Sequence, residues 1–238
     1  MQRYFSNECF NDVFTLSKDD SYHITKVMRL NFGDKIEIVL NEKTYISEII
    51  EVMPLVRAKR QEEKLEDVEL SYKVTLVQSL VKEQKMDYIL QKLTELGVDK
   101  IIPYQASRSV VKTNDKVFKK IDRWQSILKE ASEQSKRVRI PEITNVLTLD
   151  ELVNLDGYDY KFIATVNEKQ ENLKKVLSKV EKGATMIIVV GPEGGFTQYE
   201  EDKLIESGYI PISLGKSVLR TETAGVFFMS IVRFIDME

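Results

Sequence analysis

The sequence predicts an α/β protein that consists of a small N-terminal β-barrel and a larger C-terminal domain with a mostly parallel sheet. Three observations predict this class. The chain has 238 residues, which is enough for two modest domains. Residues 1–70 read as short strands, whereas residues 71–238 alternate between strand and helix patterns, as helices layered on a parallel sheet do. We therefore place the domain boundary at residue 70.

The N-terminal part contains two clear strand patterns. Asp34–Leu40 and Thr44–Val52 are apolar or alternate between apolar and polar residues, and a short polar turn separates them. Lys18–Leu30 is the segment with a helical pattern in this part of the chain. The apolar residues that carry this helical pattern are Tyr22, Val27 and Leu30. A charged stretch, Arg57–Glu69, then leads to the second domain.

The C-terminal part contains several apolar runs with the length of buried strands. These runs are Lys73–Ser79, Lys100–Tyr104, Lys161–Val166, Thr185–Val190 and Ile210–Leu214. Apolar residues at helical spacing predict two helices between them, and Gly97 is a natural stop for the first. The residues that carry these two helices are Met86, Ile89, Leu90, Leu93 and Leu96, then Val117, Ile121, Trp124, Leu128 and Ala131.

Two further helices follow. The segment Thr197–Glu200 has the pattern of a capping box, in which Thr and Glu side chains satisfy free N–H groups at a helix start. The last helix is expected over Ala224–Phe234 and is apolar nearly all round. Such a helix needs cover on both sides, either within its own subunit or at a subunit interface.

Composition excludes several function classes. The single cysteine, Cys9, cannot form an internal disulfide, and with the single histidine, His23, it cannot supply the common zinc-ligand sets. We therefore expect no metal. Ser- or Cys-based triads would have to use His23, which lies in no recognisable elbow motif. The longest apolar run, Met186–Val190, is too short to span a bilayer, and the first residues lack a signal-peptide pattern. We expect a cytoplasmic protein without a membrane partner.

Charge is unevenly distributed along the chain. Lys and Arg number 35 and Asp and Glu 38, so the formal net charge is −3. Residues 1–70 hold 10 basic and 14 acidic side chains, whereas residues 108–139 hold 10 basic and four acidic ones, a local net charge of +6. A patch of this kind can bind a phosphate backbone on an acidic protein. It is also compatible with a solvated helix face, so it does not decide the function.

The first candidate functional loop is Gly191–Gly195, directly after the strand Thr185–Val190. Its sequence is Gly-Pro-Glu-Gly-Gly. Glycine lacks a Cβ, so a ligand can approach the backbone closely, and open α/β sheets bind ligands beyond the carboxyl ends of their strands. The loop lacks the GxGxxG spacing of dinucleotide folds, which disfavours hydride chemistry. A tight turn without a ligand is the alternative interpretation.

The second candidate loop is Ser213–Ala224. Its Gly-Lys-Ser at 215–217 imitates the end of a P-loop, but a P-loop needs glycine where this chain has Ile210, so we reject nucleotide triphosphate hydrolysis. What remains is a strand-end loop with Leu219, Arg220, a carboxylate and two hydroxyls just before a helix. A helix cap with a salt bridge would explain the same residues without a ligand.

Together the two loops resemble the SPOUT class of knotted methyltransferases and, more narrowly, the RsmE family, which methylates N3 of a uridine in 16S ribosomal RNA. The resemblance rests on the Gly-Pro-Glu-Gly-Gly loop and on Leu-Gly-x-x-Val-Leu-Arg-Thr-Glu-Thr-Ala some twenty residues later. It extends over nearly the whole chain. The other matching segments are Glu83–Val98, Glu133–Arg137 with Pro141-Glu142, and His23–Arg29 with Gly33-Asp34.

The resemblance implies a PUA-like barrel over 1–70 that binds RNA, and a SPOUT domain over 71–238 with a trefoil knot. It implies S-adenosylmethionine as the cofactor, held mainly by backbone groups of three loops, at 165–167, 190–195 and 214–223. The residues assigned to cofactor binding are Thr165, Val190, Gly191, Pro192, Glu193, Gly194, Gly195, Leu214, Gly215, Val218, Leu219, Arg220 and Thr223. Backbone N–H and C=O groups suit the edge of an adenine ring.

For the chemistry, removal of the N3 proton spreads negative charge onto the flanking carbonyl oxygens, and a nearby guanidinium can stabilise that charge. Arg220 is the candidate for this role. Glu222 is either its orienting partner or the proton acceptor, and Glu193 is a weaker acid–base candidate.

The resemblance also implies 16S rRNA of the small ribosomal subunit as the partner and a homodimer, with Ala224–Phe234 as the expected interface. The residues assigned to RNA binding are Arg3, His23, Lys26, Arg29, Arg108, Lys112, Lys136, Arg137 and Arg139. Two other functions stay open at this stage. One is a SPOUT enzyme that methylates a ribose 2′-hydroxyl, and the other is an RNA-binding adaptor without catalysis.

Overall fold

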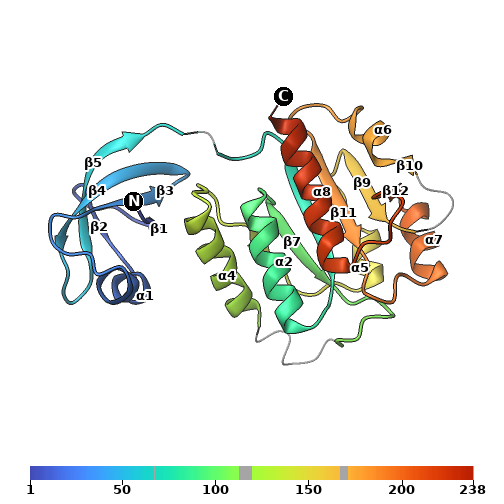
Figure 1. The fold of residues 1–238 in the computed structure, drawn as a ribbon, viewed down its shortest axis with the longest axis horizontal. Coiled ribbons are helices and arrows are strands. Elements are labelled where there is room, and N and C mark those ends of the chain that lie inside the picture. Colours follow the sequence, from blue (N-terminus) through green and yellow to red (C-terminus); the bar gives the residue numbers. More distant parts are fainter. Residues whose placement is uncertain (67, 113–119, 167–170, 238) are drawn as a thin grey trace. The chain divides into compact units, whose positions relative to one another are not determined.

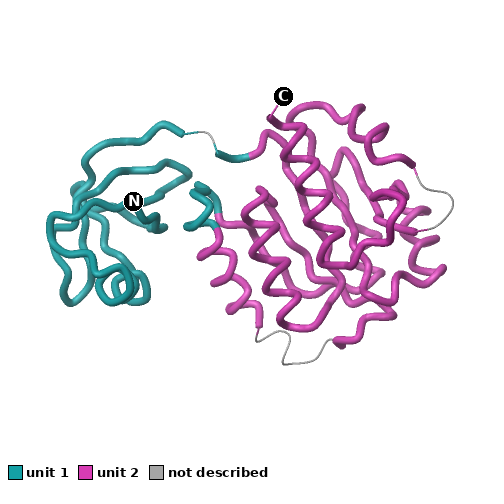
Figure 2. The backbone as a smooth tube through the Cα atoms, in the orientation of Figure 1, with its two compact units in different colours: residues 1–69, 132–139 teal, residues 70–131, 140–238 magenta. Residues whose placement is uncertain are grey.

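The computed structural model describes residues 1–66, 68–112, 120–166 and 171–237. The chain divides into two compact units (Figure 2). Unit 1 contains Met1–Glu69 together with Ser132–Arg139, and unit 2 contains Leu70–Ala131 and Ile140–Glu238. A short segment from the middle of the chain therefore packs with the N-terminal unit.

Unit 1 is a curled sheet of five strands, in the order β1-β3-β4-β5-β2 (Figure 1). β1 pairs with β3 in parallel, and the other pairs are antiparallel. The edge strands β1 and β2 share no ladder among the described residues, so the predicted barrel is a half-barrel. Its strands are β1 (Arg3–Phe5), β2 (Val13–Thr15), β3 (Lys35–Leu40), β4 (Lys43–Glu51) and β5 (Arg57–Lys64).

The helical segment of unit 1 is shorter than expected. It consists of α1 (Lys18–Tyr22) and a π-helical turn, η1 (His23–Val27), and Arg29 then has a φ of 58°. Two of the apolar residues that carry the helical pattern, Tyr22 and Val27, are exposed, at 64% and 57%. Ile24 is the fully buried residue of this segment and packs into the core of the half-barrel. The charged stretch Arg57–Glu69 does not begin as a linker, because its first eight residues, Arg57–Lys64, form β5.

Unit 2 is built on a parallel sheet of seven strands, in the order β10-β12-β9-β11-β6-β7-β8. The predicted strands at 73–79, 100–104 and 185–190 are confirmed residue for residue, and the other two differ by one or two residues at their ends. The strands are β6 (Lys73–Ser79), β7 (Lys100–Tyr104), β8 (Glu142–Ile143), β9 (Tyr160–Ala164), β10 (Glu171–Asn172), β11 (Thr185–Val190) and β12 (Ile210–Ser213).

Helices cover both faces of this sheet (Figure 1). Their bounds are α2 (Glu83–Glu95), α4 (Ile121–Gln134), α5 (Leu149–Val153), α6 (Leu173–Leu177), α7 (Gln198–Glu206) and α8 (Thr221–Asp236). The capping box at Thr197 is confirmed at the start of α7, and Gly97 has the positive φ of a C-terminal stop after α2. Of the residues expected to carry the second helix, Val117 lies outside the described part of the chain.

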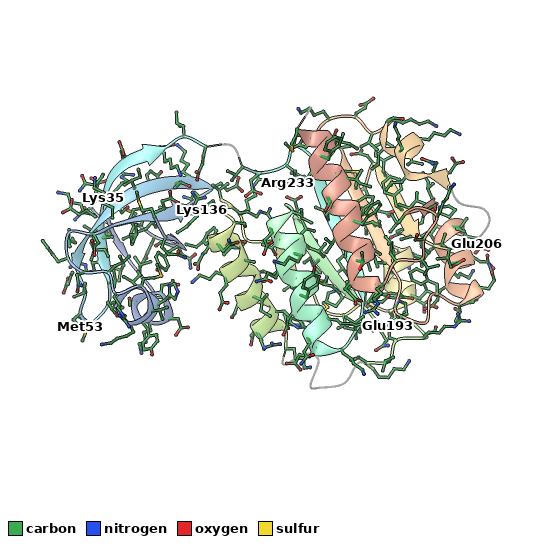
Figure 3. All side chains as sticks on the ribbon, viewed as in Figure 1. Lys35, Met53, Lys136, Glu193, Glu206 and Arg233 are labelled. Atoms are coloured by element: carbon green, nitrogen blue, oxygen red, sulfur yellow. The ribbon has the colours of Figure 1, made fainter. Side chains whose placement is uncertain are left out.

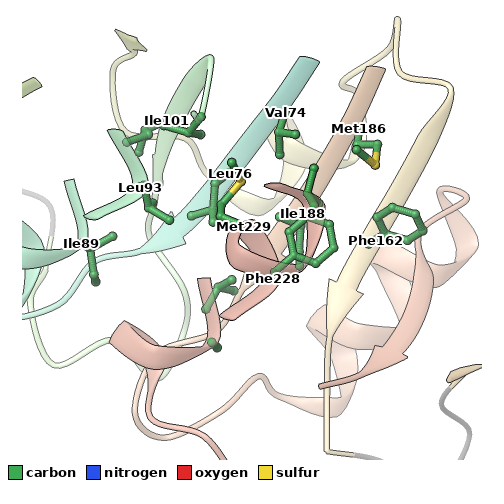
Figure 4. Packing of buried hydrophobic residues seen from close by; sticks show 14 of the residues in the cluster. Val74, Leu76, Ile89, Leu93, Ile101, Phe162, Met186, Ile188, Phe228 and Met229 are labelled. Carbon is green, nitrogen blue, oxygen red and sulfur yellow. The ribbon is translucent and has the colours of Figure 1, made fainter. Parts of the chain in front are cut away.

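The central strand β11 shows why its sequence is continuously apolar. Met186, Ile188 and Val190 face the core that α2, α4 and α8 cover, whereas Ile187 and Val189 face the core that α5 and α7 cover. Successive strand residues point to opposite faces, so burial on both faces requires an unbroken apolar run. Figure 4 shows the first of these cores, in which Phe228 and Met229 of α8 pack beside the sheet residues. Within the described residues, no helix is both long and apolar enough for a bilayer.

Candidate active site

Three loops of unit 2 line one cavity of about 890 Å³. The strands β12, β9 and β11 are neighbours in the sheet and all run in parallel, so their carboxyl ends lie at the same edge. The loops that follow these strands begin near Thr165, Gly191 and Leu214. The sheet topology therefore brings the two candidate loops and the end of β9 to one site.

The glycine-rich loop is closely packed against its surroundings. A Cβ on Gly191 would lie 3.0 Å from the ring of Phe196, and a Cβ on Gly194 would lie 3.2 Å from the Cβ of Arg108. Gly195 has a φ of 68°, which residues other than glycine rarely adopt. The Arg108 guanidinium donates to the carbonyl oxygens of Gly194 (3.2 Å) and Phe196 (3.0 Å). Glycine at 191 and 194 lets Phe196 and Arg108 pack against the backbone, and glycine at 195 fits the positive φ, so together they fix the course of the loop.

Thr221 connects the two loops. Its hydroxyl donates to the carbonyl oxygen of Gly191 at 2.7 Å and accepts from the side-chain amide of Gln78 at 2.9 Å. Gln78 is fully buried at the end of β6, and Thr221 is 5% exposed. The first residue of α8 is therefore held to the glycine-rich loop and to the centre of the sheet at once.

One of the residues that line the cavity has a buried carboxylate. Glu201 is 7% exposed, lines the cavity and accepts a hydrogen bond from the Thr165 hydroxyl at 2.8 Å. Its neighbour Glu200 completes the capping box of α7 and accepts from Tyr104 and from the Ser107 N–H, both at 2.8 Å. Burial acts to raise the pKa of Glu200, but these hydrogen bonds outweigh it and lower the pKa. The start of α7 is thereby fixed against the loop after β7.

A lysine links two carboxylates beside the cavity. The Lys85 ammonium lies 3.0 Å from Glu193 Oε1 and 3.2 Å from Glu222 Oε2. Burial acts to raise the pKa of Glu222, but a hydrogen bond from its own backbone N–H, the Lys85 ammonium and the charge of Arg220 lower it. Figure 3 shows Glu193 at the end of the sheet where α2 and α8 begin. Glu222 is therefore a carboxylate held ionised, which makes it a weak proton acceptor.

The cavity contains all but one of the residues expected to bind the cofactor. Thr165, Val190, the loop 191–195, Leu214, Gly215 and 218–220 all line it. Thr223 does not line it, because this position of α8 is exposed on another side of the helix. Asn167, at the end of the first predicted loop, lies outside the described residues. Further lining residues that lie within the expected loops or the motif that follows them are Val166, Lys216, Ser217, Thr221 and Ala224. Lining residues that the sequence did not assign to the cofactor site are Lys85, Arg108, Ala164, Phe196, Gln198 and Glu201.

Two residues assigned to RNA binding are buried in unit 1. Arg3 is fully buried and pairs with Glu37, at 3.0 Å, and with Glu66. Arg137 is 3% exposed and pairs with Glu69 at 2.6 Å. Because a buried charge needs its partner, neither guanidinium can contact RNA from this position. Their role is structural, since Arg3 also donates to the carbonyl oxygens of Lys136 and Arg137 and so holds the segment 132–139.

The other RNA-binding candidates differ in their surroundings. Lys26 and Arg29 are exposed, as are Arg108 and Lys112. His23 is half-buried, and its Nδ1 lies 3.0 Å from the Tyr4 hydroxyl. Two candidates form ion pairs within unit 1, Lys136 with Glu37 at 3.1 Å and Arg139 with Glu42 at 2.9 Å.

The basic stretch 108–139 is less positive than its sequence suggests. Lys120 pairs with Glu83 at 2.7 Å, and Arg123 pairs with Glu83 and Asp87. Lys116 and Lys119 lie outside the described residues.

Among the residues that the structure describes, no three His, Cys, Asp or Glu side chains form a group that could hold a metal ion.

Comparison with known proteins identifies the family. Residues 68–233 match the model of the RNA methyltransferase domain. Ribosomal RNA small subunit methyltransferase E of Bacillus subtilis is 34% identical over 98% of this chain and 96% of its own length. The protein of the same name from Aquifex aeolicus is 31% identical over 98% of this chain and 99% of its own length.

Two solved structures show the same fold over nearly the whole chain. A methyltransferase from Legionella pneumophila with bound cofactor SAM has a TM-score of 0.90, with 27% identity and coverage of 98% of this chain and 97% of that one. Ribosomal RNA small subunit methyltransferase E from Neisseria gonorrhoeae, bound to S-adenosyl methionine, has a TM-score of 0.87, with 28% identity and coverage of 99% and 98%. With its fold, its cavity and its sequence in agreement, this chain belongs to the ribosomal RNA small subunit methyltransferase E family.

Proposed function

We propose that this protein transfers the methyl group of S-adenosylmethionine to N3 of a uridine in the 16S ribosomal RNA of the small subunit. The observation that carries the proposal is the meeting of three strand-end loops around one cavity that Arg220 also lines. The names of the relatives support rRNA of the small subunit as the substrate, and the bound molecule in two structural neighbours supports the cofactor.

The residues of the cavity fit this cofactor. A volume of about 890 Å³ lies within the range of small-molecule sites. The glycines of 191–195 and Gly215 present backbone N–H and C=O groups without a Cβ, as an adenine edge requires. We assign the cofactor to the loops near Thr165, 190–195 and 214–220, and add Glu201, whose buried carboxylate suits a hydroxyl or ammonium group.

S-adenosylmethionine supplies an electrophilic methyl group on a sulfonium. The chain's own contribution is to position the uracil and to stabilise charge. When N3 loses its proton, negative charge spreads onto the two adjacent carbonyl oxygens of the base. The Arg220 guanidinium is exposed, lines the cavity and presents several donors in one plane, so it can bind such an oxygen as the charge develops.

Glu222 orients Arg220 in this proposal. Its charge lies close enough to Arg220 for the guanidinium to lower its pKa, and Lys85 fixes it on the other side. A carboxylate with a lowered pKa is a poor general base at neutral pH but a good partner for a guanidinium. Of the two roles that the sequence left open for Glu222, this arrangement favours orientation.

RNA binding is proposed for the exposed cations of both units. In unit 1, Lys26 and Arg29 lie in the same segment as Tyr22 and Phe32, which are 64% and 71% exposed. Exposed aromatic rings beside cations suit unpaired bases and their phosphates. In unit 2, the proposed contacts are Arg108 and Lys112, which are exposed, whereas the exposed Arg123 is paired with Glu83 and Asp87. We propose His23 and the paired residues Lys136 and Arg139 as secondary contacts.

A homodimer is proposed through the outer face of α8. Phe227 and Phe234 are 38% and 65% exposed, and with Ile231 they line a second cavity of about 930 Å³ next to α6. Large exposed apolar patches typically mark interaction surfaces. Sedimentation is expected to give the mass of a dimer, and Phe234→Asp is expected to shift it towards the monomer.

Nucleoside mass spectrometry of small-subunit rRNA, with and without the gene, tests the function. We expect 3-methyluridine to disappear when the gene is deleted and to return with the wild-type copy but not with Arg220→Ala. Loss of a ribose-methylated nucleoside would show a 2′-O enzyme instead. An unchanged nucleoside pattern, together with calorimetry that detects no S-adenosylmethionine binding, would show an adaptor.

A further inference from the structure

Lys85 joins three elements that are distant in the sequence. It lies in the first turn of α2, Glu193 lies in the glycine-rich loop after β11, and Glu222 lies in the first turn of α8. Its ammonium is 3.0 Å from one carboxylate and 3.2 Å from the other, so the two carboxylate oxygens are at most 6.2 Å apart. Lys85 lies in the matching segment Glu83–Val98, and no role at the site was assigned to it from the sequence, although it lines the cavity.

The charges of this cluster depend on one another. Hydrogen bonds to Glu193 and then to Glu222 raise the pKa of Lys85, so the ammonium stays protonated at neutral pH. The side chains of Lys85 and Glu193 are both 32% exposed, and that of Glu222 is 16% exposed. At this burial, two carboxylates without a cation between them would repel each other appreciably. The Arg220 charge also acts on Glu222, but Lys85 is the cation that pairs with both carboxylates and so allows both loops to bring one to the same place.

We propose that Lys85 is a positioning residue that holds the glycine-rich loop and the start of α8 in the geometry that binds the cofactor. The inference rests on the proposed function. Thr221 joins the same two loops on the buried side through Gly191. Lys85 joins them on the more exposed side, where Glu193 and Glu222 carry charge. Without its ammonium, repulsion between the carboxylates separates the loops, which lowers the affinity of the cavity for the cofactor and misplaces Arg220.

The proposal distinguishes positioning from direct contact with the ligand. If Lys85 acts by neutralising Glu193 and Glu222, then any change that removes one of the two negative charges compensates for its loss. Acid is one such change, because the pKa of one carboxyl rises when two carboxylates are close together. Glu193→Gln is another. A lysine that merely donated to the ligand would be compensated by neither.

Calorimetry with S-adenosylhomocysteine at pH 7.5 and pH 5 is the experiment. Lys85→Met keeps the length of the side chain and removes the charge. We expect its affinity to be about tenfold lower than that of the wild type at pH 7.5, as the loss of two partly exposed ion pairs implies. At pH 5 we expect the difference to shrink to about threefold or less. Adding Glu193→Gln is expected to restore most of the affinity at pH 7.5.

Lys92→Met is the matched control. Lys92 lies on the same helix, is similarly exposed at 33%, and pairs with Glu95 at 2.8 Å, but it does not line the cavity. We expect its affinity to stay within twofold of the wild type. The inference is overturned if Lys85→Met binds like the wild type, or if its defect persists both at pH 5 and with Glu193→Gln. A wild-type protein that does not bind S-adenosylhomocysteine would overturn the proposed function itself, and the inference with it.

Discussion

Replacing Thr221 by valine is expected to loosen the buried contact between the two loops of the cavity. Valine has nearly the same shape as threonine but lacks the hydroxyl. The substitution removes the donor for the Gly191 carbonyl at 2.7 Å and the acceptor for the Gln78 amide at 2.9 Å. The Gln78 amide keeps a second acceptor, the carbonyl oxygen of Ser79 at 3.0 Å. The Gly191 carbonyl is therefore the group that loses most.

The size of the effect follows from these two bonds. A buried hydrogen bond contributes about 1 kcal/mol net, and a group left without a partner costs about 1–3 kcal/mol. Since the Gln78 amide is partly compensated, we expect a loss of about 2 kcal/mol in unfolding free energy. For a chain of this size, that lowers the melting temperature by about 4–8 °C. If most of this energy comes from the arrangement of the loops, cofactor affinity falls about tenfold.

Two measurements and two controls check this expectation. Thermal unfolding reports the stability, and calorimetry with S-adenosylmethionine reports the affinity. Thr221→Ser keeps the hydroxyl and is expected to behave nearly as the wild type. Thr223→Val makes the same chemical change two residues later, at an exposed position outside the cavity, and should change neither quantity. The reasoning is refuted if Thr221→Val matches the wild type in both measurements, or if Thr223→Val is equally harmful.

Three other predictions concern charge. Arg220→Ala is expected to lower the turnover of methyl transfer to small subunits by about 10²-fold. Its affinity for the cofactor, measured by calorimetry, should stay within a few-fold of that of the wild type. Arg233→Ala, at the other end of α8, is the control. Burial acts to raise the pKa of Glu37, but hydrogen bonds from lysines and the buried guanidinium of unit 1 lower it to about 2, from 4.5. The stabilisation that ionised Glu37 contributes is therefore complete above pH 4.5 and is lost as the pH falls towards 2. Glu37→Gln should lower the free energy of unfolding at pH 7 by about 2 kcal/mol. Unfolding measured over a series of pH values should then show a weaker loss of stability towards acid in the variant than in the wild type. Replacing Lys26 and Arg29 together by alanine should weaken RNA binding and reduce the slope of log affinity against log salt by about 1 to 2, and an unchanged slope would contradict their contact with phosphates.

The sequence was most informative where burial is continuous. β11 is covered on both faces, so its apolar run has a single interpretation and its bounds could be predicted. β5 shows the opposite case. Of its eight residues only Ala58 is buried, and its place between β4 and β2 depends on backbone pairing that leaves no apolar pattern. A strand of this kind resembles a charged linker until its partners are known.

The candidate site likewise contains features that the sequence could predict and others that it could not. Glycine-rich loops at strand ends carry a local signal, and the structure brings them together as the parallel topology requires. The contacts of Gln78, Lys85 and Thr221 have no such signal, because each joins residues that are far apart in the chain. Charge was equally ambiguous. Arg3 was indistinguishable by sequence from a cation that binds phosphate, and only its burial beside Glu37 shows that it holds the half-barrel together.

The segment 132–139 limits how this protein can be taken apart. The chain crosses between the units three times, after Glu69, after Ala131 and after Arg139, so no single cut releases the half-barrel intact. A fragment ending at residue 70 would retain Arg3 but lose the backbone carbonyls to which it donates, and Glu69 would lose Arg137 and the N–H groups of 138 and 139. The N-terminal unit therefore cannot be isolated as one continuous segment, and a truncated or exchanged unit must include both Met1–Glu69 and Ser132–Arg139.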